Sequence, residues 1–151
     1  MVDINNRKDI IALLNNLKSE SVPKFGKMTA QHMVEHLTFA IMFSNGKLPQ
    51  KLYLPLDKAE LIKEKFIYSD NELPIGFKAP MLGDDLPKLI FPDLNVAVRE
   101  LLNEVDHFDN YFLENGEIEP INPTMGKLDK REWIIFHNKH FAHHFRQFNL
   151  L

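Results

Sequence analysis

The chain has 151 residues, of which 44% are hydrophobic and 26% are charged, and its formal net charge at pH 7 is −3. This composition is typical of a globular protein, and we expect a single domain over residues 1–151. Because binding to nucleic acid depends on clustered Lys and Arg, the slightly acidic balance excludes nucleic acid as an expected partner.

The sequence contains no cysteine, which excludes disulfides, thiolate metal sites and a cysteine nucleophile. The N-terminal residues carry no apolar signal-peptide core, and no apolar run reaches the roughly 18 residues needed to cross a bilayer. We therefore expect a cytoplasmic protein with no membrane partner.

Hydrophobic residues recur at helical spacing over residues 5–19, which predicts a first helix. Thr29 is the expected N-cap of a second helix that continues to Asn45. A shorter helix is expected over residues 56–68.

Residues 69–92 contain six proline and glycine residues, which forbid a long regular element. A segment of this length is usually either a functional lid or a mobile segment, and the sequence does not say which. The third main helix is expected from an N-cap at Asp93 to about Leu113. Asp129 and Glu132 have the spacing of a capping box at the start of the last helix. Strand signals are weak throughout.

Four long amphipathic helices, with an extended segment between the second and the third, predict an all-α fold: a four-helix bundle with a long crossover. The pentapeptides Phe-Gly-Lys-Met-Thr (25–29) and Met-Gly-Lys-Leu-Asp (125–129) precede the second and the last main helix. Both contain Gly-Lys, an apolar residue and a cap. We interpret them as equivalent turns into a helix and not as evidence of a duplicated fold.

Four of the seven histidines lie within residues 137–144. Helical spacing places His140 and His144 one turn apart, on the face that also carries His137. This face also contains aromatic residues and should point into the protein, where an imidazole needs a hydrogen-bond partner or a metal ion. Two imidazoles at this spacing suit a divalent ion such as zinc, nickel or iron.

A second pair, His32 and His36, lies four residues apart on the second helix. Two helices then present imidazoles to one interior, and facing helices of a bundle commonly build metal sites there. Core histidines that are satisfied by Glu35, Gln147 or backbone carbonyls are the alternative. The sequence has no glycine-rich phosphate loop, nucleophile elbow or His-Glu-x-x-His motif.

The string His140-Phe-Ala-His143-His144-Phe-Arg-Gln147 resembles the His-x-x-His-His-x-x-Gln signature in the last helix of the DinB/YfiT-like metalloenzyme superfamily. Three further stretches resemble a branch of that superfamily with no assigned function: residues 25–37, 74–80 and 126–148. The resemblance thus covers nearly the whole chain.

This resemblance implies a four-helix bundle, often dimeric, in which His36, His140 and His144 bind a divalent ion, for which zinc and nickel are the leading candidates. Characterised relatives include low-molecular-weight thiol S-transferases and a thiol-dependent isomerase. The chain departs from many relatives at Arg146, where they have glycine, and this leaves the substrate class open.

Our leading hypothesis is a metal-dependent enzyme, either a thiol S-transferase or a hydrolase, that acts on a small molecule at an open coordination position. His32, His137 and Glu35 are candidates for a base or an orienting group, and Gln147 for a hydrogen bond to a ligand imidazole. The alternative is a non-catalytic helical module for dimerisation or small-ligand binding, whose histidines are structural.

Overall fold

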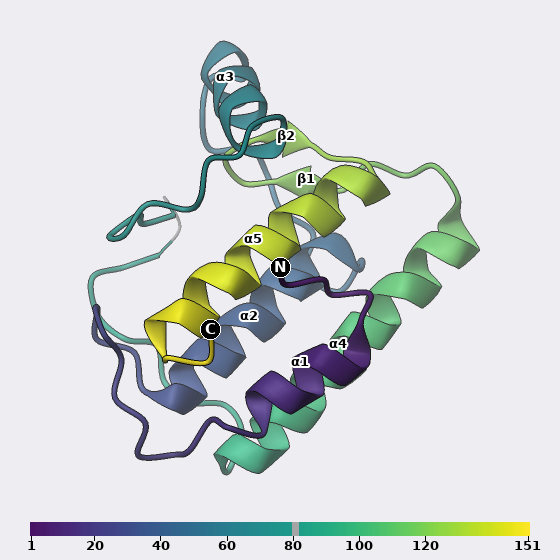
Figure 1. The fold of residues 1–151 in the computed structure, drawn as a ribbon. Coiled ribbons are helices and arrows are strands. Elements are labelled where there is room, and N and C mark those ends of the chain that lie inside the picture. The colour runs from purple at the N-terminus through teal and green to yellow at the C-terminus, as the bar shows by residue number, and fades with distance from the viewer. Residues whose placement is uncertain (80–81) are drawn as a thin grey trace.

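The computed structural model describes residues 1–79 and 82–151, and about half of the chain is helical (Figure 1). These residues form five helices and one small antiparallel sheet: α1 (Arg7–Leu14), α2 (Ala30–Ser44), α3 (Leu56–Ile67), α4 (Leu94–Asn115), β1 (Ile121–Asn122), β2 (Gly126–Lys127) and α5 (Lys130–Gln147). The expectation of a mostly helical protein is confirmed. No helix within the described ranges is both long enough and apolar enough to span a bilayer.

The N-caps of the three long helices are those expected from the sequence. The side chain of Thr29 accepts a hydrogen bond from the backbone N–H of His32, and Asp93 caps α4 in the same way. Asp129 and Glu132 form a complete capping box at the start of α5. Because each cap satisfies an N–H group that the helix itself leaves unpaired, these residues fix where the helices begin.

The two similar pentapeptides make equivalent turns into α2 and α5. Gly26 and Gly126 have φ angles of 79° and 76°, in the left-handed region, and each lies three residues before an N-cap. Glycine adopts this conformation without the steric penalty that a Cβ atom brings. The interpretation of both pentapeptides as helix starts is therefore confirmed.

The prediction of a helix over residues 5–19 is wrong for its C-terminal part, because α1 ends at Leu14. The side-chain amide of Asn16 donates to the carbonyl of Ala12, and turn hydrogen bonds replace helical ones at Asn16 and Leu17. Leu17 is nevertheless buried, so its hydrophobic spacing reflects packing in the core.

Helix α2 contacts both α4 and α5, and α3 lies at the sheet end of the molecule, where it contacts α5 and β2 (Figure 1). The core is rich in aromatic side chains from α4 and α5. Four of them are fully buried: Phe108, Trp133, Phe141 and Phe145. This packing places a face of α5 opposite α2, which positions the site described below.

The segment between α3 and α4, which we call the crossover, is attached to two helices. On α5, the ammonium group of Lys139 donates hydrogen bonds to the backbone carbonyls of Ser69 and Asn71 in the crossover and to that of Phe66 in the last turn of α3. On α2, the carboxylate of Glu35 accepts hydrogen bonds from the backbone N–H groups of Ile90 and Phe91. Residues 69–79 and 82–92 contain no helix or strand, as expected from their prolines and glycines.

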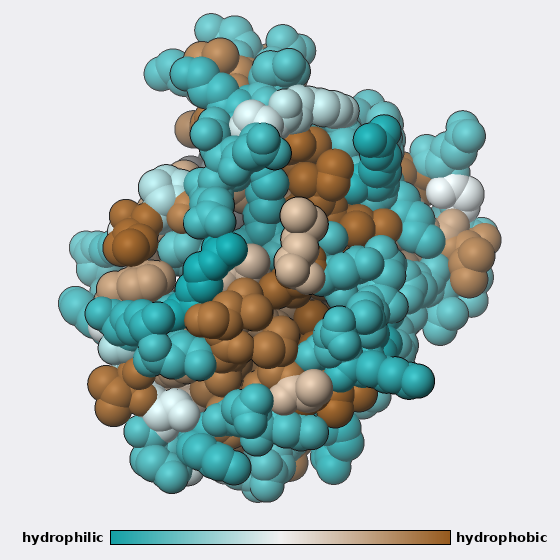
Figure 2. All heavy atoms as spheres, in the orientation of Figure 1, coloured by the Kyte–Doolittle hydropathy of each residue, from teal (hydrophilic) through white to brown (hydrophobic). Residues whose placement is uncertain are grey.

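The surface drawn in Figure 2 is largely hydrophilic and carries separate hydrophobic patches. Several exposed large hydrophobic side chains belong to the crossover: Ile75, Phe77, Leu82, Leu86, Leu89 and Ile90.

Candidate metal centre

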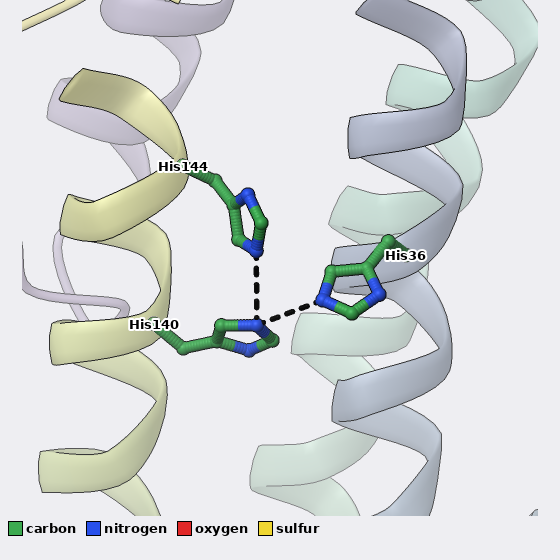
Figure 3. A group of neighbouring side chains, drawn as sticks. All are labelled: His36, His140 and His144. Atoms are coloured by element: carbon green, nitrogen blue, oxygen red, sulfur yellow. Dashed lines mark hydrogen bonds between the residues drawn. The ribbon is translucent and has the colours of Figure 1, made fainter. Parts of the chain in front are cut away.

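The imidazoles of His36, His140 and His144 converge from α2 and α5 (Figure 3). Nε2 of His140 lies 2.9 Å from Nε2 of His36 and 3.1 Å from Nε2 of His144. One nitrogen of each ring lies within 4.8 Å of those of the other two. The structure thus brings together the three residues that the resemblance names as ligands, and we call this group the histidine triad.

The helices explain why these three side chains meet. His140 and His144 are four residues apart on α5, so they share the face that packs toward α2, and only 7% and 6% of their surfaces are exposed. His36 lies on α2 and is half-buried, which makes it the most accessible of the three. The triad is therefore rigidly held on one side and closest to solvent on the other.

Gln147 fixes the orientation of His144. The side-chain nitrogen of Gln147 donates to the carbonyl of Phe25 at 2.8 Å, so its Oε1 faces Nδ1 of His144, also at 2.8 Å. Because an amide oxygen only accepts, Nδ1 of His144 carries the proton and Nε2 presents a lone pair to the triad. Metal-binding imidazoles are commonly oriented in this way. A hydrogen bond between Gln147 and a ligand imidazole was expected from the sequence.

Burial keeps the triad imidazoles neutral. Removal from water, together with the charge repulsion of nearby histidines, lowers the pKa of His36 to about 4 and that of His144 to about 3. The pKa of His140 lies well below its ordinary value for the same two reasons. Neutral imidazole is the form that binds metal ions, so all three rings are available as ligands at pH 7.

The spacing of the nitrogen atoms fits a divalent ion. Two zinc–nitrogen bonds of about 2.0–2.1 Å at a tetrahedral angle place the two nitrogens about 3.3–3.4 Å apart. The observed distances of 2.9 and 3.1 Å are shorter by a few tenths of an ångström. All three nitrogens lie within 4.8 Å of one another. Rotation of the rings to equalise these distances would give three ligands and leave a fourth position open.

His32 and Glu35, two of the three candidates for a catalytic or orienting role, are engaged outside the triad. The ring nitrogens of His32 lie 2.7 Å from Oγ1 of Thr29 and 3.0 Å from the carbonyl of Pro87. Glu35 is bound to the crossover through the backbone hydrogen bonds described above. Of the two histidines that were expected to face one site from α2, only His36 belongs to the triad.

His137, the third candidate, is fully buried. Its Nε2 lies 2.9 Å from Oγ of Ser44, and its ring stacks on Trp133 with 5.2 Å between the centroids. A side chain without exposed surface does not contact a substrate in this structure, so His137 has another role.

Sequence reasoning did not assign a contact to His143, which lies beside the triad and reaches the crossover. Its ring centroid lies 5.0 Å from that of His144, and its Nδ1 lies 3.1 Å from the carbonyl of Leu73 in the crossover. Arg146 on the same helix forms an ion pair with Glu72. The spacing of Lys139, His143 and Arg146 along one stripe of α5 was the available signal.

A family model described as a protein of unknown function (DUF1569) matches residues 78–150. This range covers α4, both strands and α5, so it includes His140 and His144 but not His36. No curated protein and no solved structure matches the chain. These comparisons show a similarity of the second half and do not bear on the DinB/YfiT-like resemblance, which stays a prediction.

Proposed function

We propose that this protein binds a divalent metal ion, zinc or nickel, through His36, His140 and His144, and that it catalyses a reaction of a small molecule. The observation that carries the proposal is the convergence of three neutral imidazoles from two helices. Three protein ligands with an open position are typical of catalytic zinc, whereas structural zinc usually has four protein ligands.

When bound, the ion would act as a Lewis acid that lowers the pKa of water or stabilises a thiolate. The chain has no cysteine, so a thiol would come from a low-molecular-weight cosubstrate. Thiol S-transfer and hydrolysis are therefore the two reaction classes that we propose. The contribution of the chain is to hold the rings neutral, to orient His144 through Gln147 and to bury two of the three rings.

We also propose that the chain is a DinB/YfiT-like protein whose four-helix bundle consists of α1, α2, α4 and α5, with α3 in the long connection between α2 and α4. The placement of the signature histidines on α5, and the contacts of α2 with α4 and α5, support this assignment. A homodimer and a cytoplasmic location stay predictions. The exposed hydrophobic side chains of the crossover support the homodimer.

The test is elemental analysis of protein purified without a histidine tag, together with melting temperatures measured with and without added zinc or nickel. We expect the wild type to bind about one ion per chain and to be stabilised by it. His140→Ala should not bind a stoichiometric amount of metal, and its melting temperature should not rise when metal is added.

His32→Ala is the matched control, because it removes a histidine from α2, one turn before His36, and leaves the triad complete. It should keep the wild-type metal content. A wild type that binds no ion and melts at the same temperature with and without metal would contradict the proposal. That result would favour the non-catalytic module with structural histidines.

A further inference from the structure

Two buried nitrogen atoms on α5 have no hydrogen-bond partner within residues 1–79 and 82–151: Nδ1 of His137 and Nδ1 of His140. The two residues are three positions apart and therefore lie on neighbouring parts of one helix face. Buried polar atoms are nearly always paired, with protein or with ordered water, so two orphaned atoms one helical turn apart require an explanation.

Ser44 fixes which nitrogen of His137 carries the proton. The hydroxyl of Ser44 donates to the carbonyl of Ile41 at 2.8 Å, so its oxygen is left to accept from Nε2 of His137 at 2.9 Å. His137 is neutral because burial lowers its pKa to about 3. A neutral ring that donates through Nε2 has an unprotonated Nδ1, which is therefore a buried acceptor.

The proton of His140 is on the opposite nitrogen when the triad holds a metal ion. Nε2 of His140 lies between the other two triad rings and is the nitrogen that would bind the ion. Nδ1 then carries the proton and is a buried donor. The two orphaned atoms are thus complementary, one donor and one acceptor, on residues three positions apart on α5.

We propose that one buried water molecule bridges these atoms, accepting a hydrogen bond from Nδ1–H of His140 and donating one to Nδ1 of His137. His137 and Ser44 would then be positioning residues for the ligand His140. This inference rests on the proposed metal site. The hydrogen-bonded chain runs from Ser44 on α2 through His137 and the water to His140 on α5, so it connects the two helices that supply the ligands.

The surroundings of His137 favour this role over packing alone. Its ring lies between aromatic rings, with centroids 5.2 Å from Trp133 and 5.6 Å from Phe108. The indole N–H of Trp133 donates to the carbonyl of Pro120 and does not compete for Nδ1 of His137. A phenylalanine would satisfy the same packing without leaving a polar atom unpaired. The presence of a histidine at position 137 is therefore explained by the hydrogen bonds that its ring nitrogens can form.

The test compares the zinc affinity of the wild type with those of His137→Phe and His137→Asn, measured by competition with a chromogenic chelator. The phenylalanine keeps the aromatic packing and removes both nitrogens, and we expect it to weaken zinc binding by about 10–100-fold. The asparagine keeps a polar group near the position of Nδ1 and should retain an affinity closer to that of the wild type. Equal affinity of wild type and His137→Phe would overturn the inference and leave the metal site intact.

The positions of the protons on the histidine rings give a second measurement, which is made on the wild type. In zinc-loaded wild type, nitrogen-15 NMR of the histidine rings should show His137 protonated at Nε2 and His140 protonated at Nδ1. Ser44→Ala removes the acceptor for Nε2 of His137 and should weaken zinc binding in the same direction. His137 protonated at Nδ1 would overturn the inference. A wild type that binds no zinc would overturn the metal site and, with it, this inference.

Discussion

Gly26 contributes to the orientation of the triad although it lies outside it. Its φ angle is 79°, and a Cβ atom built at this position would lie 3.0 Å from the side-chain nitrogen of Gln147. That nitrogen donates to the carbonyl of Phe25, and the same amide orients His144. A methyl group at residue 26 would therefore disturb the one side chain that fixes the proton of His144.

We expect Gly26→Ala to lower both the free energy of unfolding and the metal affinity. Gly76→Ala is the matched control, because Gly76 has a similar positive φ angle of 82° and a Cβ atom there would meet nothing within 4 Å. Both variants should lose about 1 kcal/mol of stability through backbone strain. Only Gly26→Ala should weaken zinc binding in a chelator competition, by about 10-fold. Equal zinc affinity of the two variants would contradict this link.

At the scale of helices, each triad ligand follows directly after a residue that holds the crossover. Glu35 precedes His36, Lys139 precedes His140, and His143 precedes His144. Successive residues on a helix point about 100° apart, so one side chain faces the triad while its neighbour faces the crossover. The crossover is consequently fastened to the two helices that carry the ligands.

Lys139→Met should loosen the start of the crossover, because it removes three hydrogen bonds to backbone carbonyls within residues 66–71. Hydrogen–deuterium exchange of this segment should become faster by about 10–100-fold, since hydrogen bonds to a charged group are worth about 1.5–3 kcal/mol. Lys58→Met, which removes the same charge from an exposed position of α3, should leave the exchange unchanged. Similar exchange in the two variants would show that Lys139 does not hold the segment.

The helices and the triad were predictable from sequence to different degrees. Caps such as Thr29 and Asp129 act within three residues, so local sequence fixes the start of each long helix. Four-residue spacing likewise placed His140 and His144 on one face. The carbonyls that His32 and Lys139 contact between α3 and α4, such as that of Pro87, lie more than 50 positions away in sequence, and no local pattern encodes them. Helical spacing also gave a wrong prediction at Leu17. This residue lies in a turn after α1, and its side chain is buried in the core.

The whole molecule carries four neutral imidazoles in its interior, three that are buried and one, His36, that is half-buried: His36, His137, His140 and His144. Their pKa values are lowered in the folded protein, to about 4 for His36 and about 3 for His137 and His144, and well below the ordinary value for His140. In the unfolded chain each has a pKa of about 6.5. Between pH 6.5 and 4 the unfolded chain therefore binds protons that the folded protein does not.

Stability should consequently be complete above about pH 6.5 and should fall as the pH drops toward 4. Each of these histidines contributes up to about 1.4 kcal/mol per pH unit well below pH 6.5, so several together give a steep decline. Urea unfolding of the metal-free protein at pH 7, 6 and 5 measures this slope. His137→Phe should reduce this slope by an amount that corresponds to about one proton. Stability that stays constant from pH 7 to pH 5 would contradict the burial of neutral imidazoles. Bound zinc should steepen the decline, because protonation of its ligands releases the ion.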